Sequence, residues 1–232
     1  MNTVHLSTRL ATVASFVETG AVVADIGSDH AYLPCFLVHN GIVERAIAGE
    51  VVKGPYDSAV KNVRHEGLAS AVTVRLANGL LAIEASDRVD TVTIAGMGGP
   101  LIASILESGK DRLQGVKRII AQPNIYAKAI REWAISNDWG IIEEAILKED
   151  GKIYEVIVLE RGLAMYSELE MLVGPILLQA KSAVFLEKWQ RELKEWQRVL
   201  VSLEKAEQTA AIEERKHELV MQIDFVGKAL MI

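Results

Sequence analysis

The chain has 232 residues, of which half are hydrophobic, with a formal net charge of −6 and a single cysteine, Cys35. The length suits one sizeable domain with an appendage, and no apolar run approaches the length of a membrane span. One cysteine excludes an internal disulfide and a cysteine-based zinc site, and the acidic balance argues against indiscriminate nucleic-acid binding. We therefore expect a cytoplasmic enzyme or binding protein without metal. The oligomeric state is left open, with a monomer favoured.

The N-terminal run has apolar residues at helical spacing, namely Leu6, Leu10, Val13 and Val17. This spacing predicts an amphipathic helix beside a sheet. Short β-branched runs then alternate with longer amphipathic runs up to about Glu160. The strand candidates are Val22–Ile26, Ala46–Glu50, Val72–Leu76, Thr91–Ala95, Arg118–Gln122, Gly140–Leu147 and Tyr154–Glu160. The helix-like stretches between them include Tyr56–Glu66 and Leu101–Ser108.

Strand–helix alternation of this kind is typical of βαβ units and a parallel sheet, so we predict an α/β fold. The last two strand candidates are separated by a short segment in which Glu149-Asp150-Gly151 forms the turn. Such a short connection predicts a hairpin, and one of the two final strands should therefore run antiparallel.

The chain after Gly162 carries no strand pattern, so the predicted domains are residues 1–162 and 163–232. Helical periodicity covers Ile176–Ala206 and Thr209–Met231. In the first run, apolar residues recur at steps of four and three: Phe185, Trp189, Leu193, Trp196, Leu200 and Leu203. The short break at residues 207–209 predicts an antiparallel helical hairpin with a coiled-coil seam.

The first strand candidate ends in Asp25-Ile26-Gly27, where an open α/β sheet places its ligand. Gly27 permits a tight turn, and a helix beginning near His30 would point its amide groups at the site. A dinucleotide-binding loop would continue with further glycines, but Asp29 and Ala31 stand in their places. An ordinary strand-to-helix turn is the alternative interpretation.

The next two strand candidates also end in polar residues. Glu50 ends the second, where an acid can accept hydrogen bonds from ribose hydroxyls, although a solvated strand end would look the same. Asn78 and Gly79 end the third. The amide can pair with the edge of an adenine ring, and a plain Asn-Gly turn is the alternative.

Glycines and an amide follow the fourth and fifth strand candidates. The segment "TIAGMGG", residues 93–99, holds three glycines in four positions, which indicates a flat ligand near the backbone or a tight packing loop. The segment "AQPN" ends at Asn124, which could hydrogen-bond a base or cap the following helix. All five strand tips are expected to meet at one edge of the sheet.

With these residues in view, the sequence resembles the bacterial tRNA (adenine-22-N1)-methyltransferases, which use S-adenosylmethionine. The resemblance is carried, in order, by Leu6-Ser7-x-Arg9-Leu10, "ADIGSDHAYLP", "AIAGE", "TIAGMGG", "QPN" and "EDGKIYEV". It implies a class I methyltransferase domain, which is Rossmann-like, followed by a helical coiled-coil domain. The cofactor contacts that it implies are Asp25, Gly27, Glu50, Asn78, Gly79, Ala95, Gly96 and Met97. We include Ser28, which follows Gly27 directly. Asn78 stands where the family leads us to expect an aspartate.

The resemblance also suggests a role for Asp29. Adenine N1 attacks a sulfonium methyl with its in-plane lone pair and needs no strong base, but methylation leaves a positive charge on the ring. A carboxylate beside the ring would stabilise that charge, so we expect Asp29 and Asn124 to be the catalytic residues. The alternative is that Asp29 caps a helix starting near Ala31.

A tRNA substrate must present N1 unpaired or flipped out, and the expected contacts in the first domain are Arg9, His30 and Gly98. In the second domain, basic residues fall mostly within half of a helix circumference: Lys181, Lys188, Arg191, Lys194, Arg198 and Lys205. We expect Arg191 and Arg198 to contact tRNA phosphates. Because glutamates are interleaved with these basic residues, a solvated helix face that binds no phosphate is an equally good interpretation.

Three other functions remain to be separated from this one. A nicotinamide-dependent oxidoreductase would need more glycines in the first loop. A non-catalytic RNA-binding protein on a degenerate methyltransferase fold would not need Asp25 and Glu50. A small-molecule methyltransferase would not need the C-terminal hairpin.

Overall fold

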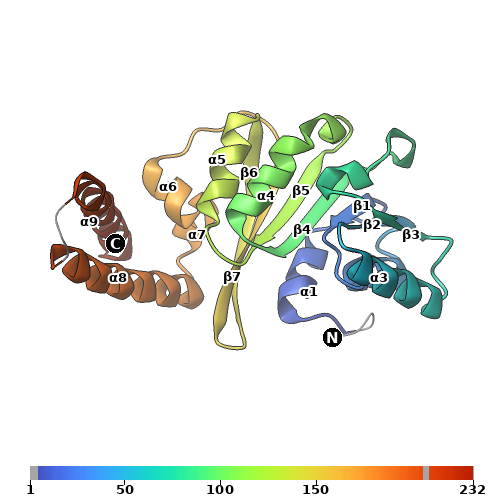
Figure 1. Ribbon diagram of the computed structural model, residues 1–232, viewed down its shortest axis with the longest axis horizontal. Coiled ribbons are helices and arrows are strands. Elements are labelled where there is room, and N and C mark those ends of the chain that lie inside the picture. The colour runs from blue at the N-terminus through green and yellow to red at the C-terminus, as the bar shows by residue number, and fades with distance from the viewer. Residues whose placement is uncertain (1–4, 206–208, 232) are drawn as a thin grey trace. The chain divides into compact units, whose positions relative to one another are not determined.

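The computed structural model describes residues 5–205 and 209–231 (Figure 1). The chain divides into two compact units, Met1–Met165 and Tyr166–Ile232. The division falls three residues beyond the boundary that we placed at Gly162.

Within the described residues, the first unit contains one seven-stranded sheet with the order β3-β2-β1-β4-β5-β7-β6. The strands are β1 (Val22–Ile26), β2 (Arg45–Glu50), β3 (Val72–Leu76), β4 (Thr91–Met97), β5 (Arg118–Pro123), β6 (Trp139–Glu149) and β7 (Lys152–Arg161). The first five are parallel, whereas β7 runs antiparallel to both β5 and β6. The predicted α/β fold with an antiparallel last strand is confirmed.

Every predicted strand is present, and β1 and β3 have the predicted bounds. The other strands are longer than predicted, because the backbone ladder continues past the β-branched runs; β4, for example, reaches Met97. The hairpin turn is Asp150-Gly151, with φ of 50° and 76°, and Glu149 pairs with Lys152. Two left-handed residues suit a tight hairpin, because they match the twist of the strands.

Helices cover both faces of the sheet (Figure 1). They are α1 (Thr8–Ser15), α2 (Tyr32–His39), α3 (Lys53–His65), α4 (Gly99–Ser108) and α5 (Lys128–Ser136), with short 3-10 helices η1 (Gly79–Ala82), η2 (Ala85–Asp87) and η3 (Lys110–Leu113). Successive side chains of a strand point to opposite faces of the sheet, which shows that α1 and α5 cover different faces. On β7, Val156 packs beneath α1, whereas its neighbour Glu155 faces α5. Helices α3 and α4 begin earlier than the predicted Tyr56 and Leu101.

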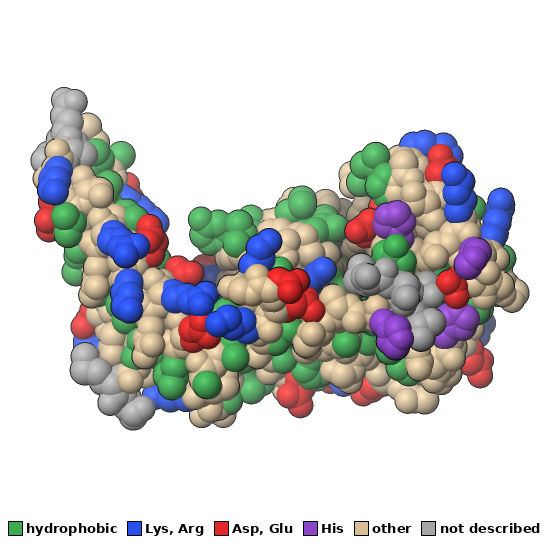
Figure 2. Space-filling view, turned by 90° about the horizontal axis from the view of Figure 1, so that it is seen from below, with side chains coloured by type: hydrophobic (Ala, Val, Ile, Leu, Met, Phe, Trp, Pro, Cys, Tyr) green, Lys and Arg blue, Asp and Glu red, His purple; other side chains and the backbone are tan. Residues whose placement is uncertain are grey.

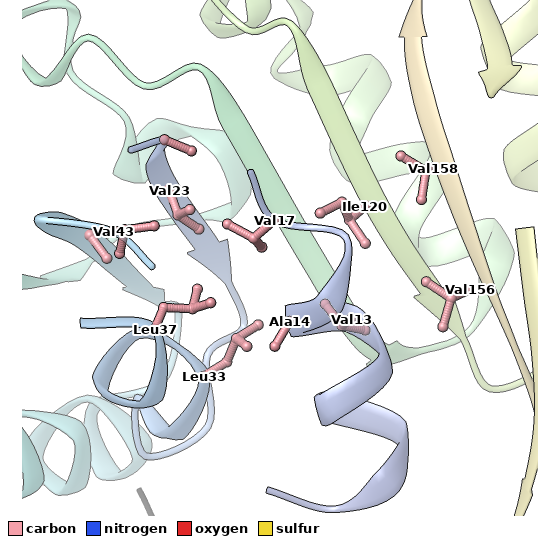
Figure 3. Packing of buried hydrophobic residues seen from close by; sticks show 12 residues of the cluster. Val13, Ala14, Val17, Val23, Leu33, Leu37, Val43, Ile120, Val156 and Val158 are labelled. Carbon is pink, nitrogen blue, oxygen red and sulfur yellow. The ribbon is translucent and has the colours of Figure 1, made fainter. Parts of the chain in front are cut away.

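The predicted N-terminal helix packs across the sheet (Figure 3). Val13, Ala14 and Val17 are buried in one cluster with residues of β1, α2, β5 and β7. The first turn of α1 is capped twice, since Ser7 accepts from the Leu10 amide and Glu149 of the hairpin accepts from the Thr8 amide at 2.5 Å. The N-terminal segment is therefore tied to the β6–β7 hairpin.

A buried charge cluster joins α5 to the antiparallel hairpin. The guanidinium of Arg131 is fully buried and lies 2.7 Å from Glu144 of β6 and 2.5 Å from Glu155 of β7. The two carboxylates hold the pKa of Arg131 above its ordinary value, against the opposing effect of burial. A buried charge is tolerated only when it is paired in this way.

The second unit consists of helices: α6 (Glu168–Val173), α7 (Pro175–Ala180), α8 (Ala183–Glu204) and α9 (Ala210–Met231). The predicted continuous helix from Ile176 to Ala206 is wrong, because the chain breaks between α7 and α8. Lys181 is left-handed there, with φ of 42°, and Ser182 caps α8. Ala206 and the predicted break at residues 207 and 208 lie outside the described residues. Helices α8 and α9 pack on each other, with Phe185 and Trp189 buried in α8 and Leu219 and Val226 buried in α9.

Cys35 is buried in α2, and burial raises the pKa of its thiol to about 12, which agrees with a packing role. No cluster of three or more His, Cys, Asp or Glu residues able to hold a metal ion occurs in the described ranges. Of the helices that the structure describes, none has both the length and the apolar character needed to cross a membrane.

Candidate functional site

The carboxyl ends of the parallel strands form one edge of the sheet, and the strand order reverses there between β1 and β4. Open α/β sheets bind their ligands at such a reversal. The loop after β1, the end of β2 and the loop between β4 and α4 all reach this edge. The structure therefore brings the sequence-predicted strand tips together.

The loop after β1 has an unusual backbone. Gly27 has a φ of 72°, and three consecutive non-glycine residues, Asp29, His30 and Ala31, have φ of 40°, 66° and 56°. Left-handed residues of this kind cost energy and occur where the surrounding structure enforces them, often at functional sites. Helix α2 begins at Tyr32 with Ala31 as its N-cap residue, so the helix predicted to start near His30 or Ala31 is present, and the left-handed residues lie immediately before it.

Two hydrogen bonds from neighbouring elements hold this loop. Asn62 of α3 donates to the carbonyl oxygen of His30 at 2.7 Å, and the amide of Asp29 donates to Oε1 of Glu50 at 2.5 Å. Sequence reasoning missed Asn62, because an asparagine in the middle of a helix carries no local signal for such a contact. The strained loop is fixed by α3 and β2 together.

Asp25 lies beneath the loop and is 3% exposed. Its two carboxylate oxygens accept from Thr93 at 2.7 Å and from Ser28 at 2.6 Å. Burial raises its pKa, and the two hydroxyl donors oppose that rise. These contacts make Asp25 a support that fixes Ser28 and the loop from below.

Glu50, at the end of β2, is 6% exposed. Its Oε1 accepts from the Asp29 amide, while Oε2 has no hydrogen-bond partner among the described residues. Burial raises the pKa of Glu50, the Asp29 amide lowers it, and the carboxylates of Asp25 and Asp29 raise it further. One free oxygen on a buried carboxylate is suited to accept a hydroxyl hydrogen from a ligand.

Asp29 itself points its side chain away from the protein, with 74% of it exposed, and lies 3.6 Å from Nε2 of His30. The His30 ring stacks on Tyr32 with 5.3 Å between centroids. Helix α2 has no side-chain cap, and its N-cap residue is Ala31. The alternative that Asp29 caps this helix is therefore wrong, and its carboxylate is open to a ligand.

The tip of β3 carries Asn78 and Gly79. Asn78 is exposed and precedes η1, whereas Gly79 has a φ of 53°. A Cβ at Gly79 would lie 3.1 Å from Ile105 of α4, so both the backbone angle and the packing favour glycine. The Ala77 amide bonds the Glu50 carbonyl at 2.7 Å, which ties this tip to β2.

The glycine-rich loop after β4 approaches the loop after β1. The side chain of Met97 lies over Gly27 and would overlap a Cβ there. A Cβ at Gly99 would overlap the backbone of Tyr126, so the third glycine is required for packing. Ala95 pairs with Gln122 and Met97 pairs with Pro123 of β5, whereas Gly96, with a φ of 80°, lies at the irregularity between them. Packing thus accounts for Gly99, and a ligand beside this loop stays a prediction.

Asn124 does not cap α5, because that helix begins at Lys128 with Ala127 as an N-cap that makes no side-chain bond. Instead, Nδ2 of the Asn124 side chain donates to the Gly96 carbonyl at 2.7 Å, and the backbone amide of Asn124 donates to the Met97 carbonyl at 2.7 Å. The amide side chain is exposed at the tip of β5. The capping alternative is therefore wrong.

Gln122 and Arg9 stand behind Asn124. Gln122 is fully buried, and its Oε1 accepts from the Gly96 amide at 2.9 Å and from Nη1 of Arg9. The Arg9 guanidinium also lies 5.6 Å from the centroid of the Tyr154 ring. Sequence reasoning assigned Arg9 to the substrate and missed Gln122, since nothing in "AQPN" distinguishes a buried amide from an exposed one.

An apolar rim surrounds this edge of the sheet. Its members are large hydrophobic side chains that are about half exposed or more: Val51, Val52, Leu76, Leu81, Leu101, Ile125 and Tyr126. Tyr126 is 72% exposed and has a φ of 57°, which is rare for a bulky residue. Exposed apolar side chains at strand tips provide flat surface for a planar ligand.

The comparisons with known proteins decide the family. The family model described as tRNA (adenine(22)-N(1))-methyltransferase matches residues 23–227. A Bacillus subtilis protein of the same description is 47% identical over 236 aligned residues, which cover 99% of each chain. The chain belongs to the tRNA (adenine(22)-N(1))-methyltransferase family. The resemblance stated from the sequence is thereby confirmed.

Two solved structures of this family show how far the similarity extends. The crystal structure of the B. subtilis m1A22 tRNA methyltransferase has a TM-score of 0.93 with 45% identity, covering 98% of this chain and 99% of that one. A putative tRNA (m1A22) methyltransferase from Streptococcus pneumoniae, solved in complex with S-adenosyl-L-methionine, has a TM-score of 0.89 with 46% identity. It covers 97% of this chain and 100% of its own. The Rossmann-like class I fold is confirmed.

The two arginines predicted to bind tRNA lie on α8 of this family member. Arg191 is paired with Glu187, and Nη1 of Arg198 lies 3.4 Å from Glu195. Figure 2 shows Lys and Arg side chains along the C-terminal helices, at the left of the view, with acidic side chains among them. Both the phosphate-binding and the solvated-face interpretations stay open, and a role for these arginines remains a prediction.

Proposed function

We propose that this protein transfers the methyl group of S-adenosylmethionine to N1 of adenine 22 in tRNA. The observation that carries the proposal is the arrangement of Glu50 and Asp29 at the edge of the sheet, in a chain that belongs to this family along most of its length. The buried carboxylate of Glu50 accepts a hydrogen bond from the Asp29 backbone amide and keeps one oxygen free, while the carboxylate of Asp29 is exposed. The first is suited to the cofactor and the second to the base.

The residues at the edge fit S-adenosylmethionine. Oε2 of Glu50 is available to accept from the ribose hydroxyls. Gly27 and Gly96 have positive φ, so the backbone can turn tightly at the edge of the sheet where the methionine part of the cofactor would lie. Val51 and Val52 follow Glu50 and offer exposed apolar surface for the adenine of the cofactor. Asn78 and Gly79 would bound that surface from β3.

When bound, S-adenosylmethionine supplies an electrophilic methyl group on a sulfonium. Adenine N1 attacks with its in-plane lone pair, so the protein needs no strong base for this nucleophile. The ring then gains a positive charge that it shares with its exocyclic amine. The exposed carboxylate of Asp29 stabilises this charge, and the fixed backbone around it keeps the carboxylate in place.

The tRNA must present an unpaired or flipped adenine, because N1 lies on the pairing edge. The exposed side chains of Ile125 and Tyr126 provide an apolar surface on which a flipped base can stack. His30 and Gly98 are proposed to contact the same nucleotide. Arg191 and Arg198 are proposed to contact phosphates farther along the tRNA.

The test is a methylation assay with purified protein, unmodified tRNA and S-adenosylmethionine, followed by digestion to nucleosides and mass spectrometry with chromatographic standards. We expect 1-methyladenosine to accumulate and N6-methyladenosine to be absent. Product from a Glu50→Ala variant should be strongly reduced. Formation of N6-methyladenosine, or of no methylated nucleoside, would contradict the proposal.

A further inference from the structure

A line of hydrogen bonds runs from α1 to the tip of β5 and ends at Asn124. We infer that Arg9 and Gln122 are positioning residues that lock the side-chain amide of Asn124 in one orientation, so that Asn124 binds N6 and N7 of the target adenine and leaves N1 free. This inference rests on the proposed function and assigns a substrate contact within it.

The chemistry of the donors fixes the orientation of Gln122. A guanidinium and a backbone amide can only donate, so the atom of Gln122 that meets both Arg9 and the Gly96 amide must be its oxygen. The nitrogen Nε2 is then left on the other side. It donates to the Pro123 carbonyl at 2.9 Å and to Oδ1 of Asn124 at 3.4 Å.

The orientation of Asn124 follows from that of Gln122. Because Oδ1 of Asn124 accepts from Nε2 of Gln122, its Nδ2 lies toward the Gly96 carbonyl, to which it donates at 2.7 Å. A flipped amide would place Oδ1 against that carbonyl, with two acceptors facing each other. Both neighbours of Asn124 therefore select the same orientation.

An amide in a fixed orientation can recognise adenine. One hydrogen of Nδ2 and one lone pair of Oδ1 are used within the protein, which leaves one donor and one acceptor on the exposed side chain of Asn124. An asparagine amide pairs with adenine by donating to N7 and accepting from the N6 amine. This edge of the base does not include N1, so the nucleophilic nitrogen stays free for methyl transfer.

The position of Arg9 explains how α1, which is not at the strand tips, contributes to the orientation of Asn124. Side chains alternate between the two faces along β5, so Gln122 lies on the same face as Ile120. Ile120 packs in the cluster that contains the buried residues of α1, so this is the face that α1 covers. The guanidinium of Arg9 bridges Gln122 and the Tyr154 ring. Its stem is held by α1, which Glu149 anchors at the first turn.

The chain offers a matched control at the other end of the same strand. Arg118 begins β5 and also links it to the α1 segment, since Nη1 donates to the Phe16 carbonyl at 3.0 Å and Nε donates to Glu160 at 2.9 Å. Arg9 and Arg118 thus both connect β5 with the N-terminal segment on one face of the sheet. Only Arg9 is connected to Asn124.

The experiment compares Arg9→Met, Gln122→Glu and Arg118→Met in the full-length protein. Gln122→Glu keeps the acceptor for Arg9 and for the Gly96 amide but loses the donor to Asn124. We expect Arg9→Met and Gln122→Glu to lower the single-turnover rate of methyl transfer at saturating tRNA and cofactor by about tenfold, the scale of one lost orienting hydrogen bond. The Kd for S-adenosylmethionine should be unchanged. Arg118→Met should lower the melting temperature and leave this rate unaltered.

A modified substrate tests the assigned contact directly. A tRNA carrying 7-deazaadenosine at position 22 lacks the N7 acceptor but keeps N1 and the exocyclic amine. The wild-type protein should methylate it about tenfold more slowly than the unmodified tRNA. The Gln122→Glu variant should show little further loss on the modified tRNA, because the two changes remove the same interaction.

Three results would overturn the inference. Equal rates of the wild-type protein on the two substrates would exclude the N7 contact. A raised Kd for tRNA with an unaltered rate in Arg9→Met would mean that Arg9 contacts the substrate itself. Parallel losses of rate and melting temperature in all three variants would reduce Arg9 and Gln122 to a structural role. A wild-type protein that forms no 1-methyladenosine would instead contradict the proposed function.

Discussion

The backbone amide of Asp29 donates a hydrogen bond to the side chain of Glu50 at 2.5 Å, which joins the loop after β1 to the end of β2. The bond uses the backbone of Asp29 and only one oxygen of Glu50. Each residue therefore keeps a carboxylate oxygen for another partner. This division allows one contact to organise both the cofactor side and the base side of the proposed site.

Replacing Asp29 by asparagine separates charge from shape. Asparagine tolerates left-handed backbone well and retains the amide that bonds Glu50, so the melting temperature should change little. The rate of methyl transfer should fall by about a hundredfold, a typical scale for deleting one preorganised electrostatic contact. Single-turnover kinetics at saturating tRNA and cofactor measure this step. A rate near that of the wild-type protein would show that the exposed carboxylate takes no part in the chemistry.

Cofactor binding should depend on pH through Glu50. Burial raises the pKa of Glu50 above its ordinary value of 4.5, so the ionised form that accepts from ribose is lost at a higher pH than for a solvated glutamate. The Kd for S-adenosylmethionine should therefore rise as the pH falls through this raised pKa. In Glu50→Gln, binding should be weaker at neutral pH and the pH dependence should disappear. Isothermal titration calorimetry over a pH series checks both, and an unaltered pH dependence in Glu50→Gln would assign it to another group.

The same shift has the opposite sign for folding stability. A carboxyl with a raised pKa binds its proton more tightly in the folded state than in the unfolded chain. Relative to Glu50→Gln, the wild-type protein should become more stable as the pH falls from the raised pKa toward 4.5. Urea unfolding without cofactor, followed for both proteins at each pH, distinguishes this effect from the change in binding.

Gly27→Ala should weaken cofactor binding, because a Cβ at this position would overlap the Met97 side chain and occupy the turn that faces the ligand. Gly151→Ala is the matched control, with a φ of 76° close to the 72° of Gly27 and open space around its Cβ. Both variants should lose about 1 kcal/mol of stability from the left-handed backbone. Only Gly27→Ala should raise the Kd for S-adenosylmethionine, by about tenfold. Equal affinities in the two variants would remove Gly27 from the cofactor site.

The Arg131 cluster predicts a purely structural effect. Arg131→Met would leave Glu144 and Glu155 buried without their cation, so the free energy of unfolding should fall by about 3–5 kcal/mol. Arg191→Met breaks an exposed ion pair on α8 and should cost less than about 0.5 kcal/mol. Denaturant unfolding followed by circular dichroism compares them, and a small loss in Arg131→Met would mean that packing compensates for the ion pairs.

Charge reversal on α8 tests the tRNA contact. If Arg191 and Arg198 meet phosphates, the double variant Arg191→Glu and Arg198→Glu should raise the Kd for tRNA. The slope of log Kd against log salt should flatten by about one for each lost contact. An unchanged slope would favour the solvated face that the neighbouring glutamates also permit.

The seven strands could be predicted from the sequence because the β-branched runs are short, apolar and separated by turn residues. The candidate functional residues at the tips of β1 and β2 could also be predicted, because Asp25 and Glu50 each interrupt an apolar pattern. The left-handed backbone of Asp29, His30 and Ala31 could not be predicted, because Glu50 and Asn62 from other elements hold this loop.

Two further features are not recorded by any local pattern that we recognised in the sequence. The break between α7 and α8 rests on one left-handed lysine, Lys181, within a run of good helix formers. The line from Arg9 through Gln122 to Asn124 joins α1 to the tip of β5 across more than a hundred residues of sequence. Residues at strand tips can be read from the sequence, whereas the residues that orient them cannot.

The most direct test of the central claim is to map the methyl group on the RNA. Two tRNA transcripts, identical except that adenine 22 is replaced by guanine in one, are incubated with the protein and S-adenosylmethionine and then digested to oligonucleotides for tandem mass spectrometry. We predict one methyl group in the fragment containing adenine 22 of the first transcript, identified as 1-methyladenosine, and none in the second. Methylation of both transcripts at another nucleotide, or of neither, would contradict the account.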